Sequence, residues 1–259
     1  MDFLNSIILL TNFIIVPGIT YGSQLALGAI GVTLIYGVLR FANFAYGDLM
    51  AFGTMVVILM TWYLQSKGIS FGLLPTALLA LPIGILLTIA VSLFFDKTVF
   101  EYYRNKKSNP VTFIVVSLGI MFVLNAVVRI IIGPNDINFM DGHKFIMKAR
   151  EFKQLTGLNE GLAIKSTQVI TLVTTIITCS ILFYFLNKTK TGKSMRAYSN
   201  NEDLALLSGI DPKKIVLITW VIVSILATVA GTLYGLDKSF KPFTYFNNLL
   251  PIFAATIVG

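Results

Sequence analysis

Apolar residues along the chain form long uninterrupted runs, and short polar segments separate them. Most of these runs approach the 20 or so residues that a helix needs to cross the hydrocarbon layer of a membrane. The pattern predicts an all-α fold, a polytopic membrane helical bundle in one domain over residues 1–259. The runs that predict spanning helices are 49–64, 73–95, 111–132, 168–186 and 215–236, and a final run, 249–259, is only about half a membrane long.

The first apolar run is ambiguous. Residues 3–39 include no charged side chain. This run is longer than one straight span needs and shorter than two spans with a turn need. Because Pro17 and Gly18 divide the run, we expect a short interfacial or tilted piece over 4–16 and a full span over 19–39. Two tight passes are the alternative, so the side on which the N-terminus lies stays open.

A polar and aromatic segment, 41–48, interrupts the apolar pattern directly after Arg40. Hydrocarbon offers no partners to exposed backbone groups, so such a break is tolerated only where it is buried in protein or lines a wet cavity. We therefore interpret Asn43, Tyr46 and Asp48 as candidates for a translocation pathway. The other interpretations are that Asn43 caps the following helix and that Tyr46 belongs to an interfacial aromatic belt.

The composition is that of a membrane protein, with 56% hydrophobic residues, 12% charged residues and a mean hydropathy of +0.81. Soluble domains contain about 25% charged residues. The formal net charge of +8 does not indicate nucleic acid as a partner, because most Lys and Arg lie in short segments between apolar runs. A lone Cys179 excludes an internal disulfide framework, a lone His143 excludes a His-rich metal site, and no cofactor is predicted.

The basic segments predict the orientation in the membrane. Segments 96–110 and 187–214 each hold several Lys and Arg and are separated by two spans, so both are expected on the cytoplasmic side. The long mixed-charge segment 133–167 is then external. The break 41–48 lies towards the inner end of its span or dips into the membrane there. We interpret Arg129 as snorkelling to the interface, with a gating or intersubunit role as the alternative.

A short helix is predicted within the cytoplasmic segment 187–214. One of residues 199–201 can cap it, Glu202 and Asp203 favour the positive end of its dipole, and Gly209 is a natural C-cap. Its apolar patch can dock into a groove on a soluble partner or rest on lipid headgroups. This patch consists of Leu204, Ala205, Leu206 and Leu207.

Segment 196–210 resembles the coupling-loop motif of ABC importer permeases. In the branched-chain amino acid permease family the motif reads roughly Arg-Ala-x5-Glu-Ala-Ala-x3-Gly-Ile. Here Asp203 and Leu204 stand where that motif has Glu and the first Ala, whereas Ala205 and Gly209 match it.

Segment 36–48 is similar to a second signature of the same family, Tyr-Gly followed by Asn-Phe-Ala-His-Gly-Glu/Asp. Tyr46 stands where the family has His, which replaces a titratable group by a larger hydrogen-bonding ring. Asn125 and Arg129 also have family counterparts. Family members continue beyond the position of Gly259 through a glycine-rich segment and a final span, so we expect the sequence to be incomplete at its C-terminus.

The resemblance implies a permease subunit of a binding-protein-dependent ABC importer, without a catalytic site of its own, in the plasma (cell inner) membrane. The solute would be a branched-chain or related amino acid. An external solute-binding protein would deliver it, ATPase subunits would act on the coupling helix from the cytoplasm, and a second permease subunit, identical or sister, would complete the pathway. The implied pathway residues are Tyr36, Asn43, Tyr46 and Asp48, and the implied coupling residues are Arg196, Asp203, Leu204, Ala205 and Gly209.

Other functions fit the sequence less well. A secondary transporter or channel driven by an ion gradient usually needs charged groups within its spans, and 73–95, 168–186 and 215–236 contain none. A membrane-embedded enzyme would need a constellation of His, Asp or Glu, which the sequence does not offer. An ABC permease for urea, short amides or a sugar remains an alternative, because the external partner normally sets the substrate.

Overall fold

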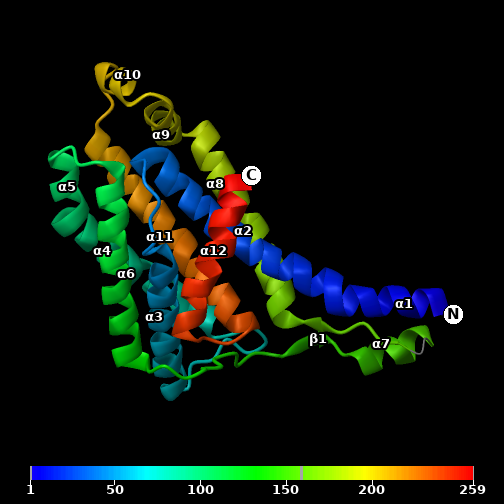
Figure 1. The fold of residues 1–259 in the computed structure, drawn as a ribbon. Coiled ribbons are helices and arrows are strands. Elements are labelled where there is room, and N and C mark those ends of the chain that lie inside the picture. Colours follow the sequence, from blue (N-terminus) through cyan, green and yellow to red (C-terminus); the bar gives the residue numbers. More distant parts are fainter. Residues whose placement is uncertain (1, 158–159, 259) are drawn as a thin grey trace.

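The computed structural model describes residues 2–157 and 160–258, and these are helical almost throughout (Figure 1). Six helical segments of the described chain are long and apolar enough to cross a membrane, which confirms the all-α membrane bundle. These segments contain α2 (Val16–Leu39), α3 (Tyr46–Ser66), α4 (Ala77–Phe95), α6 (Pro110–Ile132), α8 (Ser166–Lys188) and α11 (Pro212–Asp237). A further helix, α12 (Pro242–Val258), has 17 residues and is not among the six.

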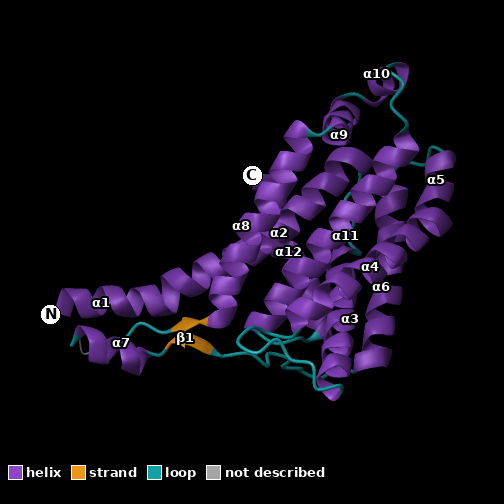
Figure 2. Cartoon of the chain, turned by 180° about the vertical axis from the view of Figure 1, so that it is seen from behind, coloured by secondary structure: helices purple, strands orange, loops and turns teal. Residues whose placement is uncertain are grey.

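Shorter elements lie at the two ends of the bundle. At one end are α5 (Glu101–Asn105), α9 (Lys190–Asn200) and α10 (Glu202–Leu207), and we call it the α9–α10 end. At the other are α1 (Asp2–Leu10), α7 (Ala149–Thr156) and an antiparallel pair of strands, β1 (Phe145–Met147) and β2 (Ile164–Lys165), and we call it the β1–β2 end. Figure 2 shows the strands and their loops gathered there.

The N-terminal helix is continuous. A π-helical turn, Thr11–Ile15, joins α1 to α2, so the alternative of two tight passes is wrong. Pro17 lies in the first turn of α2, where its missing N–H is accommodated, and the wider turn comes just before it. Figure 1 shows α1 leaving the bundle and running beside β1 and α7. The chain therefore forms one continuous helical segment, Asn5–Leu39, and its wider turn lies at Thr11–Ile15 rather than at Pro17 and Gly18.

Asn12 holds this N-terminal extension against the long polar segment. Its Nδ2 donates to the carbonyl oxygen of Gly161 at 2.6 Å, and its Oδ1 accepts from the backbone N–H of Ala163 at 2.9 Å. Asn5 accepts from the backbone N–H of Glu160 at 3.4 Å. The start of the chain therefore lies at the β1–β2 end.

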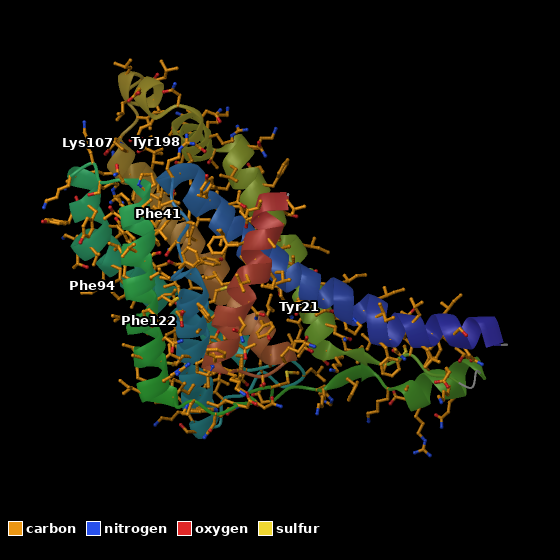
Figure 3. All side chains as sticks on the ribbon, viewed as in Figure 1. Tyr21, Phe41, Phe94, Lys107, Phe122 and Tyr198 are labelled. Atoms are coloured by element: carbon orange, nitrogen blue, oxygen red, sulfur yellow. The ribbon has the colours of Figure 1, made fainter. Side chains whose placement is uncertain are left out.

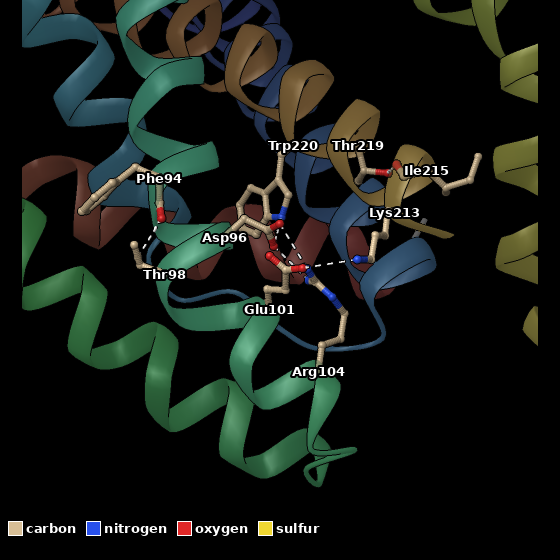
Figure 4. A network of polar contacts seen from close by, with 9 residues as sticks. All are labelled: Phe94, Asp96, Thr98, Glu101, Arg104, Lys213, Ile215, Thr219 and Trp220. Carbon is tan, nitrogen blue, oxygen red and sulfur yellow. Dashed lines mark hydrogen bonds and ion pairs between the residues drawn. The ribbon is translucent and has the colours of Figure 1, made fainter. Parts of the chain in front are cut away.

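Segment 96–110, which the sequence pattern predicts as a loop, is mostly helical. From Asp96 the helix α4 continues through a π-helical turn, Asp96–Phe100, into α5. The Asp96 carboxylate accepts two hydrogen bonds from the Arg104 guanidinium, at 2.9 and 3.1 Å, and one from Nε1 of Trp220 at 2.7 Å (Figure 4). Because its charge is paired, Asp96 does not end the helix.

Segment 187–214 also differs from expectation, since it contains two helices, α9 and α10, where one was predicted. The last helix, α12, begins earlier than the apolar run 249–259 indicated, because Pro242 starts it in the preceding polar stretch.

The core surrounds α11, which packs on α2, α3 and α4. Small residues let the backbones approach closely. A Cβ atom added at Gly231 of α11 would lie 2.6 Å from Oγ1 of Thr54 and 2.7 Å from the carbonyl oxygen of Met50. In contrast, α8 exposes most of its length.

Candidate translocation and coupling sites

The break after α2 re-enters the bundle. The chain leaves α2 at the α9–α10 end, and residues 41–45 run back inside before α3 begins (Figure 1). The backbone N–H of Phe44 donates to Oγ of Ser117 at 3.1 Å, and Asn125 reaches Asp48. On the rise of an α-helix these two α6 residues lie roughly 10 and 22 Å from its first residue. The break therefore runs from the α9–α10 end back between the helices of the bundle.

Asn43 satisfies the backbone at the start of α3. Its Oδ1 accepts from the N–H of Ala45 at 3.0 Å, and its carbonyl oxygen accepts from the N–H of Tyr46 at 3.4 Å. Asn43 is buried, so these bonds replace those that water would supply. The turn it forms precedes the helix, and the N-cap position itself is held by Ala45.

Aromatic rings enclose the re-entrant segment. Phe41 packs on Phe100 and Phe113, with ring centroids 5.2 Å away in each case, and Phe100 stacks on Trp220 at 5.4 Å. Figure 3 shows Phe41 within the bundle and Phe94 and Phe122 directed outward. The break is therefore buried in protein, which is one of the two conditions under which a membrane tolerates it.

Asp48 lies in the first turn of α3 and has no exposed surface. Its Oδ1 accepts a hydrogen bond of 2.7 Å from Nδ2 of Asn125, whereas Oδ2 has no partner among the described residues. Arg129, one turn further along α6, acts electrostatically on this carboxylate. Its guanidinium also lies 6.0 Å from the ring of Phe243 on α12. Arg129 itself is exposed, and its interpretation as a snorkelling residue stays a prediction.

Tyr46 is completely buried, so the interpretation as an interfacial belt residue is wrong. Its ring fits against α2 because position 31 is glycine: an added Cβ there would lie 2.2 Å from the Tyr46 hydroxyl oxygen. That hydroxyl has no hydrogen-bond partner in the described part of the chain.

Tyr36 does not join this buried cluster. It lies on α2 with 59% of its surface exposed. A cavity of about 10 Å³ lies beside the break, lined by Asn43, Ser92 and Trp220 among others, and this volume holds roughly one water molecule. This cavity is too small for an amino acid.

The coupling segment has two separately capped helices. The hydroxyl of Thr189 accepts from the N–H of Gly192 at 3.0 Å at the start of α9, and Oδ1 of Asn201 accepts from the N–H of Leu204 at 3.0 Å at the start of α10. Gly209 follows α10 with a φ of 78°, a left-handed conformation that favours glycine. The expected capping residue within 199–201 is therefore Asn201.

The apolar residues of α10 face two ways. Leu204 and Leu207 are 61% and 85% exposed, whereas Ala205 is buried. Ala205 belongs to a second apolar cluster, separate from the main core, that joins α10 to α2, α9 and α11; its other buried members are Val38, Met195, Tyr198 and Ile215. The expectation that Ala205 contacts a soluble partner is corrected, because its side chain packs inward and positions the helix.

Arg196 and Asp203 are both exposed, but only Arg196 makes a side-chain hydrogen bond among the described residues. Nη1 of Arg196 donates to Oδ1 of Asn187 at 3.0 Å and so ties α9 to the end of α8. The hydroxyl of Tyr198 donates to Glu202 at 2.7 Å and joins α9 to α10. Burial, together with the neighbouring Glu202 carboxylate, raises the pKa of Tyr198 above its usual range. Asp203 lies on the free surface of α10.

Two contacts that the sequence interpretation missed connect the coupling segment to the break. The Arg40 guanidinium donates to the carbonyl oxygen of Ser199, and Oγ of Ser199 donates to the carbonyl oxygen of Gly37 at 2.8 Å. Arg40 is the first charged residue after the uncharged run 3–39, and that isolation was the available signal. Nothing local in the sequence pointed to Ser199 as its partner.

The described residues contain no group of three or more His, Cys, Asp or Glu that could hold a metal ion. Polar side chains instead gather at a helix start inside an apolar bundle, and a capped amphipathic segment lies at one end. This arrangement is that of a polytopic membrane protein with a polar segment buried among its spanning helices.

Comparison with known proteins identifies which permease family. Residues 14–259 match the family described as branched-chain amino acid transport system, permease component, and the chain belongs to it. It is accordingly a non-catalytic, multi-pass component of an ABC transport system in the plasma membrane, a class that works with ATPase and solute-binding partners.

Relatives from bacteria and an archaeon cover most of the chain. The high-affinity branched-chain amino acid transport system permease protein LivH of Escherichia coli is 26% identical, over 93% of this chain and 76% of its own length. BraD, the corresponding permease protein of Pseudomonas aeruginosa, is 26% identical over 95% and 78%. A probable LivH of Methanocaldococcus jannaschii is 29% identical over 96% and 74%. No solved structure matches the chain.

Proposed function

We propose that this chain forms the translocation pathway for branched-chain or related amino acids, with Asn43, Tyr46 and Asp48 at its centre. The observation that carries the proposal is the re-entrant segment 41–45. It places the start of α3 deep within the bundle, beside a buried carboxylate that has only one hydrogen bond among the described residues.

An amino acid carries both charges, and the start of α3 offers a counterpart to each. The positive end of a helix dipole attracts a carboxylate, and discontinuous helices serve transporters in this way. The free Oδ2 of Asp48 suits an ammonium group. Tyr36 belongs to the pathway only where the exposed face of α2 meets a second permease subunit, identical or sister.

The orientation follows from the charge pattern. The α9–α10 end, with its basic segments, is cytoplasmic and meets the ATPase subunits through Leu204, Leu207 and Asp203. The β1–β2 end is external and meets the solute-binding protein. The cavity at the break holds about one water, and residues of α3, α4, α6 and α11 line it, so we expect these helices to move apart during transport.

Uptake of labelled leucine tests the proposal. Cells that lack the gene and cells that carry it again would be assayed with intact ATP, and after ATP depletion with the ion gradient held, with unlabelled valine, glutamate, urea and ribose as competitors. ATP-dependent leucine uptake is expected. Uptake of urea or ribose alone would change the substrate, and uptake that follows the ion gradient without ATP would refute the ABC mechanism.

A glycine pair tests the coupling segment. Gly209, after α10, and Gly68, after α3, have φ values of 78° and 75°, and both N–H groups donate hydrogen bonds. Proline at either position removes the donor and forces a negative φ. Gly209→Pro is expected to abolish ATP-dependent uptake, whereas Gly68→Pro, at the opposite end, is expected to retain most of it.

A further inference from the structure

We propose that Arg40 is a positioning residue that ties α9 to the re-entrant segment, so that movement of the coupling helices is carried into the translocation pathway. The inference deepens the proposed function and rests on it, because it needs ATPase subunits that act on α9 and α10. It gives Arg40 no contact with the solute.

Two hydrogen bonds join the last turn of α2 to the last turn of α9. The Arg40 guanidinium donates to the carbonyl oxygen of Ser199, and the Ser199 hydroxyl donates back to the carbonyl oxygen of Gly37 at 2.8 Å. The two turns are close: a Cβ added at Gly37 would lie 3.2 Å from the Ser199 hydroxyl oxygen.

The backbone conformation at Arg40 does not favour an arginine. Its φ of 62° and ψ of 24° are left-handed, and its N–H caps α2 by donating to the carbonyl oxygen of Tyr36 at 3.1 Å. Glycine is the usual residue at this position after a helix, because other L-residues are strained there. The structural role of the arginine therefore lies in its side chain, which donates a hydrogen bond to Ser199.

Arg40 is also the last residue before the break. The five residues after it form the re-entrant segment 41–45, which leads directly to Asp48 in the first turn of α3. On its other side, Val38 packs with Met195 and Ala205 in the second apolar cluster, so the end of α2, α9 and α10 form one packed unit. A shift of that unit displaces one end of a short non-helical segment.

Two other polar contacts of α9 do not lead there. Arg196 connects α9 to Asn187 at the end of α8, and Tyr198 connects it to α10 through Glu202. Neither α8 nor α10 continues into residues 41–45. Of these contacts, the hydrogen bond from Arg40 is the one made by the residue immediately before the break.

Lys107 offers a matched control. It follows α5 with a φ of 51°, is basic and exposed, and lies at the same end of the molecule, where Figure 3 labels it with Tyr198. Within the described residues its side chain makes no hydrogen bond or ion pair. Lys107→Gly and Arg40→Gly thus remove the same charge and relieve the same backbone strain, and only the second removes the hydrogen bond from the Arg40 guanidinium to Ser199.

The test uses the permease complex, assembled with its ATPase subunits and solute-binding protein in lipid vesicles. A cysteine reporter, Ala42→Cys in a Cys179→Ser background, would be labelled with a water-soluble thiol reagent with and without ATP. ATP is expected to change the labelling rate several-fold in the reporter and in its Lys107→Gly form. Arg40→Gly is expected to remove that response.

ATP hydrolysis and uptake give a second readout. Arg40→Gly is expected to keep the ATPase subunits bound and their basal hydrolysis, to lose stimulation by the loaded binding protein, and to lower uptake about tenfold, within the 5–150-fold range of coupled sites. Ser199→Ala removes the other bond, from the Ser199 hydroxyl to the carbonyl oxygen of Gly37, and a change in the same direction is expected.

Two results would overturn the inference. An unchanged ATP response in Arg40→Gly would remove Arg40 from the coupling path, and loss of the ATPase subunits would make Arg40 a docking residue instead. The labelling assay needs no transported solute. If labelling responds to ATP through Arg40 while leucine is not taken up, the substrate assignment fails and the inference on Arg40 stands.

Discussion

The carboxylate of Asp48 accepts a hydrogen bond of 2.7 Å from the amide of Asn125, at a position where Asp48 has no exposed surface. Asp48 opens α3 and Asn125 lies well inside α6, so one bond joins the end of the re-entrant segment to a separate spanning helix. Removing the donor leaves a buried carboxylate without its partner, which costs more than removing both polar groups.

This asymmetry predicts the outcome of a double-mutant cycle. Asn125→Leu is expected to lower the free energy of unfolding by about 2 kcal/mol, because Asp48 then has no donor. Adding Asp48→Asn removes the charge and is expected to recover part of that loss. Thermal unfolding of purified protein in detergent measures both. A double variant no more stable than Asn125→Leu alone would argue against the pairing.

Position 31 tests the packing of Tyr46. In Gly31→Ala the new Cβ would lie 2.2 Å from the Tyr46 hydroxyl oxygen, so a loss of about 1–3 kcal/mol of stability is expected from overpacking. Gly22→Ala on the same helix meets no atom within 4 Å, and it is expected to be neutral or to stabilise by up to about 1 kcal/mol.

The two alanine variants are compared by thermal unfolding under one condition. Tyr46→Phe provides an independent check, because the hydroxyl that it removes has no partner in the described chain. It is expected to leave stability within about 1 kcal/mol of the parent protein. Equal effects of Gly31→Ala and Gly22→Ala would show that the close approach of α2 and Tyr46 is wrong.

Asp141 predicts a dependence on pH at the β1–β2 end. Partial burial raises the pKa of its carboxyl, but hydrogen bonds from the backbone N–H of Thr76, at 2.8 Å, and from Gln65, at 2.9 Å, outweigh that effect and lower the pKa. A lowered pKa means that the stabilisation is complete above the ordinary pKa of Asp, near 3.9, and is lost as pH falls through the lower folded value.

Asp141→Asn measures this contribution. The variant is expected to be less stable than the parent by under about 1 kcal/mol at neutral pH, because solvent screens a carboxyl that is largely exposed. The difference is expected to stay constant above about pH 5 and to shrink in acid. Unfolding followed across pH in both proteins gives the result, and a difference that grows in acid would mean that folding raises the pKa of Asp141.

Asn12 predicts the local stability of the N-terminal extension. Asn12→Ala removes the two hydrogen bonds to Gly161 and Ala163, so faster hydrogen exchange is expected in residues 160–165, by roughly tenfold for about 1.4 kcal/mol of lost protection. Thr11→Val is the control, because the Thr11 hydroxyl bonds only within its own helix, to the carbonyl oxygen of Ile7. Equal exchange in the two variants would contradict the role of Asn12.

Hydrophobic patterning alone predicted the spanning helices, since hydrocarbon leaves a chain almost no other way to satisfy its backbone. For the same physical reason the polar break after Arg40 was recognisable as a buried or pathway-lining segment. Boundaries were less predictable where a charge is paired at a distance: Asp96 indicated the end of a helix, but Arg104 and Trp220 allow it to continue.

The sequence by itself determined that the chain is a membrane protein and where its apolar runs lie, because these depend on local composition and period. The coupling motif was located by its resemblance to the family motif. Tertiary structure alone decided which polar groups meet. It buried Tyr46 and Ala205, left Tyr36 exposed, and brought Asp48 to Asn125 and Arg40 to Ser199. Such pairs join residues 77 and 159 positions apart, and no local pattern specifies contacts over those separations.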